Sequence, residues 1–144
     1  MKVIKIEHIG FATKDLNEAK KLYSSLGMNV SENEELNDVR VAFVECGESS
    51  IELLESTISA DDTSRIEASP RLRHIAISKF IAEKGPGIHH IAFQVDDLDA
   101  ALSIMKEKGM RLIDEVAQIG AGGHKVAFIH PDSTDGVLIE LCQH

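Results

Sequence analysis

The sequence predicts an α+β fold in which two tandem βαβββ modules form a single eight-stranded mixed sheet. The main observation is an internal repeat, because Glu7–Met28 recurs as His89–Met110 at a constant offset of 82 residues. Two later pairs of segments match in the same order, Val39–Cys46 with His124–Pro131 and Ser50–Glu55 with Val137–Cys142. A chain of 144 residues suits one hydrophobic core better than two, so we expect residues 1–144 to form a single domain from both modules.

Module 1, residues 1–55, is expected to begin with a strand and a helix. Ile4–Ala12 is an apolar run rich in β-branched residues and bounded by polar ones, which predicts a strand. Apolar residues then recur at helical spacing, so we expect a helix with Asp15 as its N-cap and Gly27 just beyond its end. Three short strands complete the module, at Met28–Ser31, Val39–Glu45 and Ser50–Glu55.

Module 2, residues 87–144, repeats this order after a linker, residues 56–86. We expect its elements to be a strand at Ile88–Val95, a helix at Leu98–Lys108, and strands near Met110–Val116, His124–His130 and Gly136–Cys142. In the linker, the pattern predicts one helix at Ser78–Lys84 that ends at Gly85. His74 imitates the histidine of the two first strands, but its charged neighbours disfavour a strand there, and we assign it no site role.

Composition excludes several classes of function. The formal net charge of -9 has the wrong sign for a protein that neutralises nucleic-acid phosphates. No apolar run approaches the roughly 20 residues that a membrane helix needs, and the first residues lack the apolar core of a signal peptide. Neither Cys46 nor Cys142 lies in a CxxC motif, so we expect no disulfide or metal–thiolate role and place the protein in the reducing cytoplasm.

Superposing the two modules places metal-ligating residue types at matching positions. His8 matches His90 near the middle of each first strand, and Glu52 matches Glu140 near the middle of each last strand. Strand alternation puts each histidine on a face with small neighbours, which leaves room for a ligand. A lone histidine or glutamate is more often an ordinary surface or core residue, but four matched positions favour a metal site. Two imidazoles and two carboxylates suit Zn, Co, Ni, Mn or Fe(II).

The strands with HIGF and HHIAF and the last strands that carry glutamate resemble the vicinal oxygen chelate (glyoxalase/bleomycin resistance/dioxygenase) superfamily. Within it, GPGIHHIAFQVDDLDAAL, IGAGGHKVAFIHP and GVLIEL are most similar to the methylmalonyl-CoA epimerases. The resemblance implies a cupped, glyoxalase-like sheet around one divalent metal ion of the Co, Zn, Ni or Mn class. It implies His8, Glu52, His90 and Glu140 as ligands, an acyl-CoA substrate and a homodimer, while composition already argues against nucleic-acid and membrane partners.

The implied reaction is epimerisation of (2R)- and (2S)-methylmalonyl-CoA through a metal-stabilised enolate. Inversion at the α-carbon requires a proton to leave one face and another to arrive on the opposite face, so two bases are needed. Glu140 resembles one of them, as both ligand and base. Some family members carry a glutamate where this sequence has Val41, and we expect Glu45, on the same face of that strand, to replace it, with Glu52 as the alternative.

Two other functions stay open at the level of sequence. A glyoxalase I-like lyase acting on a glutathione hemithioacetal would use the same histidines and glutamates. A metal-free small-molecule binding protein would keep the fold and lose the metal. A dioxygenase is disfavoured, because Glu52 as a fourth ligand would crowd the open positions that oxygen needs.

Overall fold

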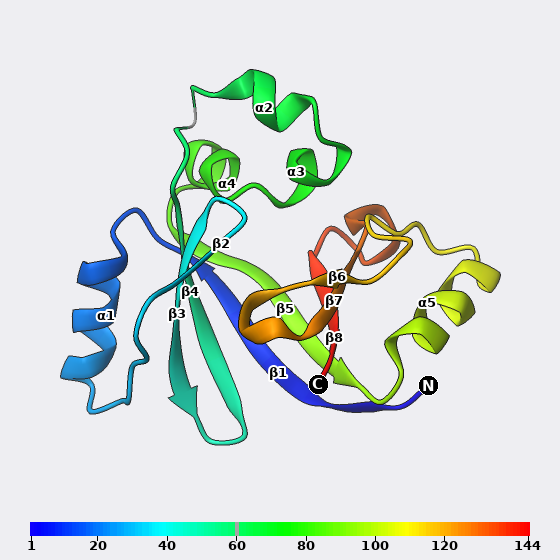
Figure 1. Ribbon diagram of the computed structural model, residues 1–144, viewed down its shortest axis with the longest axis horizontal. Helices are drawn as coiled ribbons and strands as arrows, with labels where there is room; N and C mark the ends of the chain where they lie inside the picture. The colour runs from blue at the N-terminus through cyan, green and yellow to red at the C-terminus, as the bar shows by residue number, and fades with distance from the viewer. Residues whose placement is uncertain (60) are drawn as a thin grey trace. The chain divides into compact units, whose positions relative to one another are not determined.

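In the computed structural model, which describes residues 1–59 and 61–144, eight strands form one mixed sheet in the order β2-β3-β4-β1-β5-β8-β7-β6 (Figure 1). This order and the two helices that follow β1 and β5 confirm the expected α+β class. The chain divides into two compact units, one made of Met1–His8 with His90–His144 and the other of Ile9–His89. The first strand, β1 (Val3–Ala12), therefore contributes residues to both units.

The unit Ile9–His89 contains the first helix and an antiparallel ladder. Its elements after β1 are α1 (Leu16–Ser25), β2 (Glu34–Leu36), β3 (Val39–Cys46) and β4 (Ser49–Ser56). The predicted caps of α1 are confirmed, since the Asp15 carboxylate accepts a hydrogen bond from Glu18 N and Gly27 follows the helix with a φ of 84°. Phe11 packs against the buried core beside α1, so the helix-facing side of β1 is also as predicted.

The linker between the modules is helical. Its elements are α2 (Thr63–Glu67), α3 (Pro70–Ile75) and α4 (Ile77–Lys84). Helix α4 confirms the predicted linker helix, which ends at Gly85 with a φ of 76°. His74 is exposed on α3, which confirms that it does not lie in a strand. The sequence did not predict α2 and α3, because each is too short to show a helical period.

The unit with Met1–His8 and His90–His144 repeats the helix-on-sheet arrangement. After β1 it contains β5 (Gly87–Val95), whose first three residues belong to the other unit, and then α5 (Leu98–Glu107), β6 (Gln118–Ile119), β7 (Lys125–Ile129) and β8 (Ile139–Gln143). Short 3-10 turns lie at Ala121–Gly123 and Pro131–Ser133. Strand β8 runs parallel to β5 and antiparallel to β7. Phe93 and Leu141 pack with the buried face of α5, as expected for the helix-facing side of this unit. No helix in the described parts of the chain is long and apolar enough to cross a membrane.

The strand predicted at Met28–Ser31 is wrong, because Val30 makes only an isolated bridge to Val44 and β2 lies further along the chain. In a regular ladder Phe43 N would donate to the backbone carbonyl of Ser31. Here it donates to the side-chain oxygen, Ser31 Oγ, at 2.8 Å, and the ladder is interrupted. A side-chain oxygen of this kind competes with a regular ladder.

The strand predicted at Met110–Val116 fails in the same way. Leu112 makes an isolated bridge to Ile129, and β6 lies beyond the predicted range. Here Asp114 Oδ2 accepts the hydrogen bond from Phe128 N at 2.9 Å. Phe128 occupies the position in module 2 that Phe43 occupies in module 1, so both modules interrupt the same strand by the same means.

Helices α1 and α5 have N-caps at equivalent positions of the repeat, Asp15 and Asp97, and we expect the two caps to contribute similarly to stability. The Asp15 carboxylate accepts from Glu18 N at 3.1 Å, and the Asp97 carboxylate accepts from Ala100 N at 3.0 Å. We expect Asp15→Ala and Asp97→Ala each to lower the free energy of unfolding by about 1 kcal/mol, because each removes an acceptor for a helix N–H. Urea denaturation should show a smaller loss for the matched Asn variants, which keep the acceptor. Equal losses for Ala and Asn would contradict a capping role.

Buried His89 provides a test of acid stability. Burial is the main cause that lowers the pKa of His89 from 6.5 to about 4, and the positive charge of Lys84 lowers the pKa further. A hydrogen bond with the backbone of Ile75 partly offsets the decrease. The Phe80 ring packs edge-to-face against the imidazole at 5.2 Å. The unfolded chain therefore binds this proton near pH 6.5 and the folded chain only near pH 4. Stability is expected to fall as the pH is lowered through that window, by up to about 3 kcal/mol from this group.

The measurement is the free energy of unfolding of the metal-free chain, taken from urea curves between pH 7 and pH 4. His89→Gln should make the loss on acidification clearly shallower, because the variant removes the titrating group. His74→Gln is the matched control, since His74 is exposed. An unchanged slope for His89→Gln would show that other groups cause the loss.

Candidate metal centre

Three buried side chains meet in the unit formed by Met1–His8 and His90–His144. His8 lies on β1, His90 on β5 and Glu140 on β8, and one ligand atom from each lies within 4.8 Å of the others. The two Nε2 atoms are 3.0 Å apart. Glu140 Oε1 lies 3.5 Å from the first Nε2, and Glu140 Oε2 lies 3.6 Å from the second. The structure thus brings together three of the four predicted ligands.

The two histidines meet because β1 and β5 run in opposite directions. Lys2 N donates to Asp96 Oδ1 at 2.8 Å and Asp96 N donates to Lys2 O at 3.1 Å, which joins the start of one strand to the end of the other. Six residues further along β1, and six residues back along β5, the pairing reaches His8 and His90. Their rings meet edge-to-face with centroids 5.1 Å apart.

Glu140 reaches the same place through the parallel pairing of β5 with β8. Its Cα partner is Ala92, two residues from His90 and therefore on the same face of β5. Leu141, the next residue on β8, points the other way and packs in the core beside α5. The helix side of the strands is therefore apolar, and the opposite side carries the imidazoles, the carboxylate and the small side chain of Ala92.

The three side chains fit a divalent cation. Ligand atoms bonded to one ion at roughly 2.1 Å lie about 3.0 Å apart at right angles and about 3.4 Å apart at a tetrahedral angle. The 3.0 Å between the two Nε2 atoms, and the 3.5 and 3.6 Å from these atoms to the two oxygens of Glu140, are close to that spacing. A buried carboxylate beside two imidazoles also supplies the mixed nitrogen and oxygen donors that zinc, cobalt, nickel and manganese accept.

Glu7 orients one of these imidazoles. Glu7 Oε2 lies 2.6 Å from His8 Nδ1, and since a carboxylate only accepts, the ring carries its proton on Nδ1. The hydrogen bond with His8 is the largest cause that lowers the pKa of Glu7, and burial opposes it. Nε2 of His8 therefore directs its lone pair toward the cluster, as in the carboxylate–histidine pairs of metal sites. Sequence patterns do not predict this contact, because neighbouring residues of a strand ordinarily face opposite sides of the sheet.

The other two predicted site residues lie in the unit Ile9–His89. Glu52 is buried on β4, opposite Phe43 in the ladder with β3. Glu45 lies at the exposed end of β3, where its carboxylate accepts a hydrogen bond from Asn29 Nδ2 at 3.3 Å. Val41 is buried on the same strand. The roles of Glu52 as a ligand and of Glu45 as a base stay predictions.

Known proteins resemble the chain over nearly its full length. A sequence model of the Glyoxalase/Bleomycin resistance protein/Dioxygenase superfamily matches residues 7–128. A Bos taurus protein named "Methylmalonyl-CoA epimerase, mitochondrial" is 36% identical over 143 residues, which cover 96% of this chain and 74% of the relative. A Cereibacter sphaeroides protein named "Ethylmalonyl-CoA/methylmalonyl-CoA epimerase" is 35% identical over 145 residues, covering 96% of this chain and 97% of the relative.

A solved structure agrees with these sequence matches. A variant of Streptomyces coelicolor methylmalonyl-CoA epimerase in complex with 2-nitronate-propionyl-CoA has a TM-score of 0.81 and 30% sequence identity to this chain. The match covers 99% of this chain and 95% of the solved one. The similarity therefore extends to the whole fold and includes a relative that binds an acyl-CoA compound.

Removal of the Glu7 charge tests its effect on the metal centre. We expect Glu7→Gln to weaken binding of the first equivalent of Zn²⁺ by roughly 10- to 100-fold, because the neutral amide is a weaker acceptor for the His8 Nδ1–H and no longer supports the ring with a negative charge. Calorimetric titration of the metal-free chain measures this affinity. Glu107→Gln makes the same charge change at an exposed position on α5 and should bind like the parent. Equal affinities for the two variants would show that Glu7 does not position the ligand.

Proposed function

Because the chain belongs to the methylmalonyl-CoA epimerase family of the glyoxalase/bleomycin resistance protein/dioxygenase superfamily, we propose that it interconverts (2R)- and (2S)-methylmalonyl-CoA. The observation that carries the proposal is the buried group of His8, His90 and Glu140, whose donor atoms match the spacing around one divalent cation. Such an enzyme is an isomerase. The acyl-CoA compound in the Streptomyces coelicolor relative supports a coenzyme A thioester as the substrate.

The chemistry needs a stabilised negative charge. Removal of the α-proton of a thioester leaves an enolate, and its oxygen carries charge that must be stabilised in the site. When bound, a divalent cation of the Co, Zn, Ni or Mn class supplies Lewis-acid stabilisation of that charge. His8, His90 and Glu140 are the proposed ligands, and Glu52 is the proposed fourth.

Two carboxylates are the proposed bases. Glu140 takes the α-proton on one face, so that one C–H bond breaks, and a second group returns a proton on the opposite face to form the new C–H bond. We assign the second role to Glu45. It lies on the same face of β3 as Phe43, the cross-strand partner of Glu52, so the two carboxylates lie on one side of the β3–β4 ladder.

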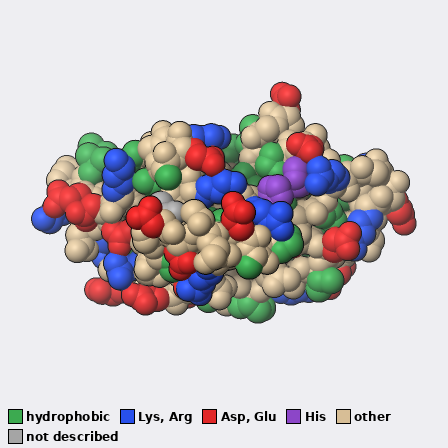
Figure 2. Space-filling view, turned by 90° about the horizontal axis from the view of Figure 1, so that it is seen from above, with side chains coloured by type: hydrophobic (Ala, Val, Ile, Leu, Met, Phe, Trp, Pro, Cys, Tyr) green, Lys and Arg blue, Asp and Glu red, His purple; other side chains and the backbone are tan. Residues whose placement is uncertain are grey.

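The remaining parts of the proposal concern the state of the protein in the cell. The net charge is -9, yet on the face drawn in Figure 2 basic side chains lie among acidic ones, so an anionic coenzyme is compatible with the surface. We include a homodimer, which light scattering checks. We also include a cytoplasmic location. Because the Bos taurus relative is named as mitochondrial, cell fractionation is needed to distinguish the two compartments.

The experiment that tests the function is exchange of the α-hydrogen of methylmalonyl-CoA with solvent deuterium, followed by mass spectrometry. Metal-loaded protein should exchange and epimerise the substrate, and chelation of the metal should abolish both. His90→Ala is expected to lower the rate by at least about 10²-fold, because it removes a ligand that holds the charge-stabilising ion. Absence of exchange by metal-loaded protein would overturn the proposal, and a methylglyoxal and glutathione assay would then test the lyase reaction.

The same assay separates the two bases. Glu45→Gln should lower epimerisation by about 10²-fold or more, because the returning proton has no donor. It should still exchange the α-hydrogen of one epimer, since Glu140 is intact. Glu48→Gln, the same change on the adjoining turn, is the matched control. Normal epimerisation by Glu45→Gln would remove Glu45 from the mechanism and leave Glu52 as the alternative.

A further inference from the structure

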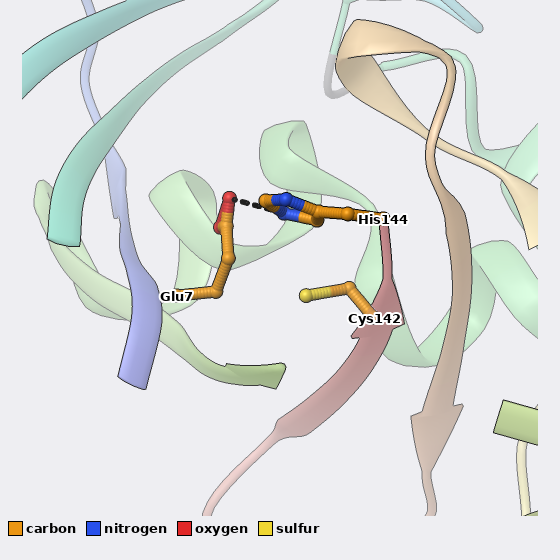
Figure 3. A group of neighbouring side chains, drawn as sticks. All are labelled: Glu7, Cys142 and His144. Atoms are coloured by element: carbon orange, nitrogen blue, oxygen red, sulfur yellow. Dashed lines mark ion pairs between the residues drawn. The ribbon is translucent and has the colours of Figure 1, made fainter. Parts of the chain in front are cut away.

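A second group of potential metal ligands lies beside the first. Glu7, Cys142 and His144 each offer one atom, and these atoms lie within 4.8 Å of one another (Figure 3). Cys142 lies on β8 and His144 follows it at the alternate position, so both side chains extend from one side of the strand. Glu7 extends from β1 toward them, and Figure 3 marks its ion pair with His144.

The Glu7 carboxylate uses its two oxygens in two directions. Oε2 lies 2.6 Å from His8 Nδ1, whereas Oε1 lies 3.5 Å from His144 Nε2. The second distance is close to the roughly 3.4 Å that separates two ligand atoms on one tetrahedral ion. The carboxylate is mostly removed from water, with its side chain 15% exposed.

The other two donors are also held in place. Cys142 is buried, and its Sγ lies 3.6 Å from Phe93 O. The His144 ring stacks on His124 with centroids 4.0 Å apart and planes 15° apart. A thiolate, an imidazole and a carboxylate are together the donor types that zinc prefers in proteins.

We propose that Glu7, Cys142 and His144 bind a second divalent cation of the zinc class, separate from the ion proposed between His8, His90 and Glu140. On binding, the S–H bond of Cys142 gives its proton to solvent and the thiolate coordinates the ion. Water completes the coordination. The cation ties β1 to the end of β8, and through Glu7 it also restrains the carboxylate that orients His8.

The thiolate provides a signature that the first site lacks. Co²⁺ replaces Zn²⁺ in such sites, and a cobalt–thiolate bond gives an intense charge-transfer absorption in the near ultraviolet that imidazole and carboxylate ligands do not give. Titration of the reduced, metal-free chain with Co²⁺ should therefore produce this band. A titration that saturates the protein without the band would overturn the proposal.

Cysteine variants assign the band. Cys142→Ser should abolish it, whereas Cys46→Ser should retain it at full intensity, because Cys46 is exposed on β3 in the other compact unit. A band that survives in Cys142→Ser, or disappears in Cys46→Ser, would contradict the assignment. Circular dichroism of each variant confirms that the fold is retained.

Two further variants separate this site from its neighbour. His144→Ala should weaken Co²⁺ binding at the thiolate site at least about tenfold, and the fold should tolerate it because the side chain is 39% exposed. An unchanged affinity would overturn the proposed ligand set. His90→Ala removes a ligand of the first site only and should keep the band. The band therefore reports on the second cation whether or not the chain epimerises methylmalonyl-CoA.

Discussion

The pairing of β1 with β5 is the constraint on which the candidate site depends. The two strands are equivalent elements of the repeat, and they run antiparallel from the Lys2–Asp96 hydrogen bonds to the contact between His8 and His90. Two equivalent residues of a repeated strand lie opposite each other only when the two strands pair with equivalent positions facing, as His8 and His90 do here. A slip of one residue would turn one histidine to the helix side of its strand and separate the two donors.

The sequence predicted the parts of the fold that depend on periodicity. The alternation of side chains along a strand predicts that Phe11 and Phe93 face the helices and that His90 faces the opposite side. The helix N-cap at Asp15 is predicted because aspartate is a preferred N-cap residue. The strand prediction failed at the two positions where a side-chain oxygen takes the place of a backbone acceptor in the ladder. Ser31 and Asp114 interrupt the same strand in the two modules, but a serine and an aspartate are not recognisable as equivalents before the structure shows their shared task.

The repeat pointed to the residues of the candidate metal centre, and the role of Glu52, which the repeat also doubles, stays a prediction. His8, His90 and Glu140 belong to matched positions and meet in the structure. Glu7 has no acidic counterpart in module 2, and its contact with the neighbouring imidazole runs against ordinary strand alternation. The sequence does not predict a metal–thiolate role for Cys142, because such sites are usually recognised by CxxC spacing. Its potential co-ligands are His144, two residues further along the chain, and Glu7 on another strand.

The residues that precede the two histidines show what the joining of two modules in one chain permits. Glu7 precedes His8 and supports it with a negative charge, whereas its counterpart His89 precedes His90 and is held neutral by burial. In a homodimer of single modules, both copies would come from one sequence, so a residue changed before one histidine would be changed before the other as well. A covalently joined pair is free of that restriction. The residues that precede the two histidines have therefore diverged in chemistry, although the histidines themselves occupy equivalent positions in the repeat.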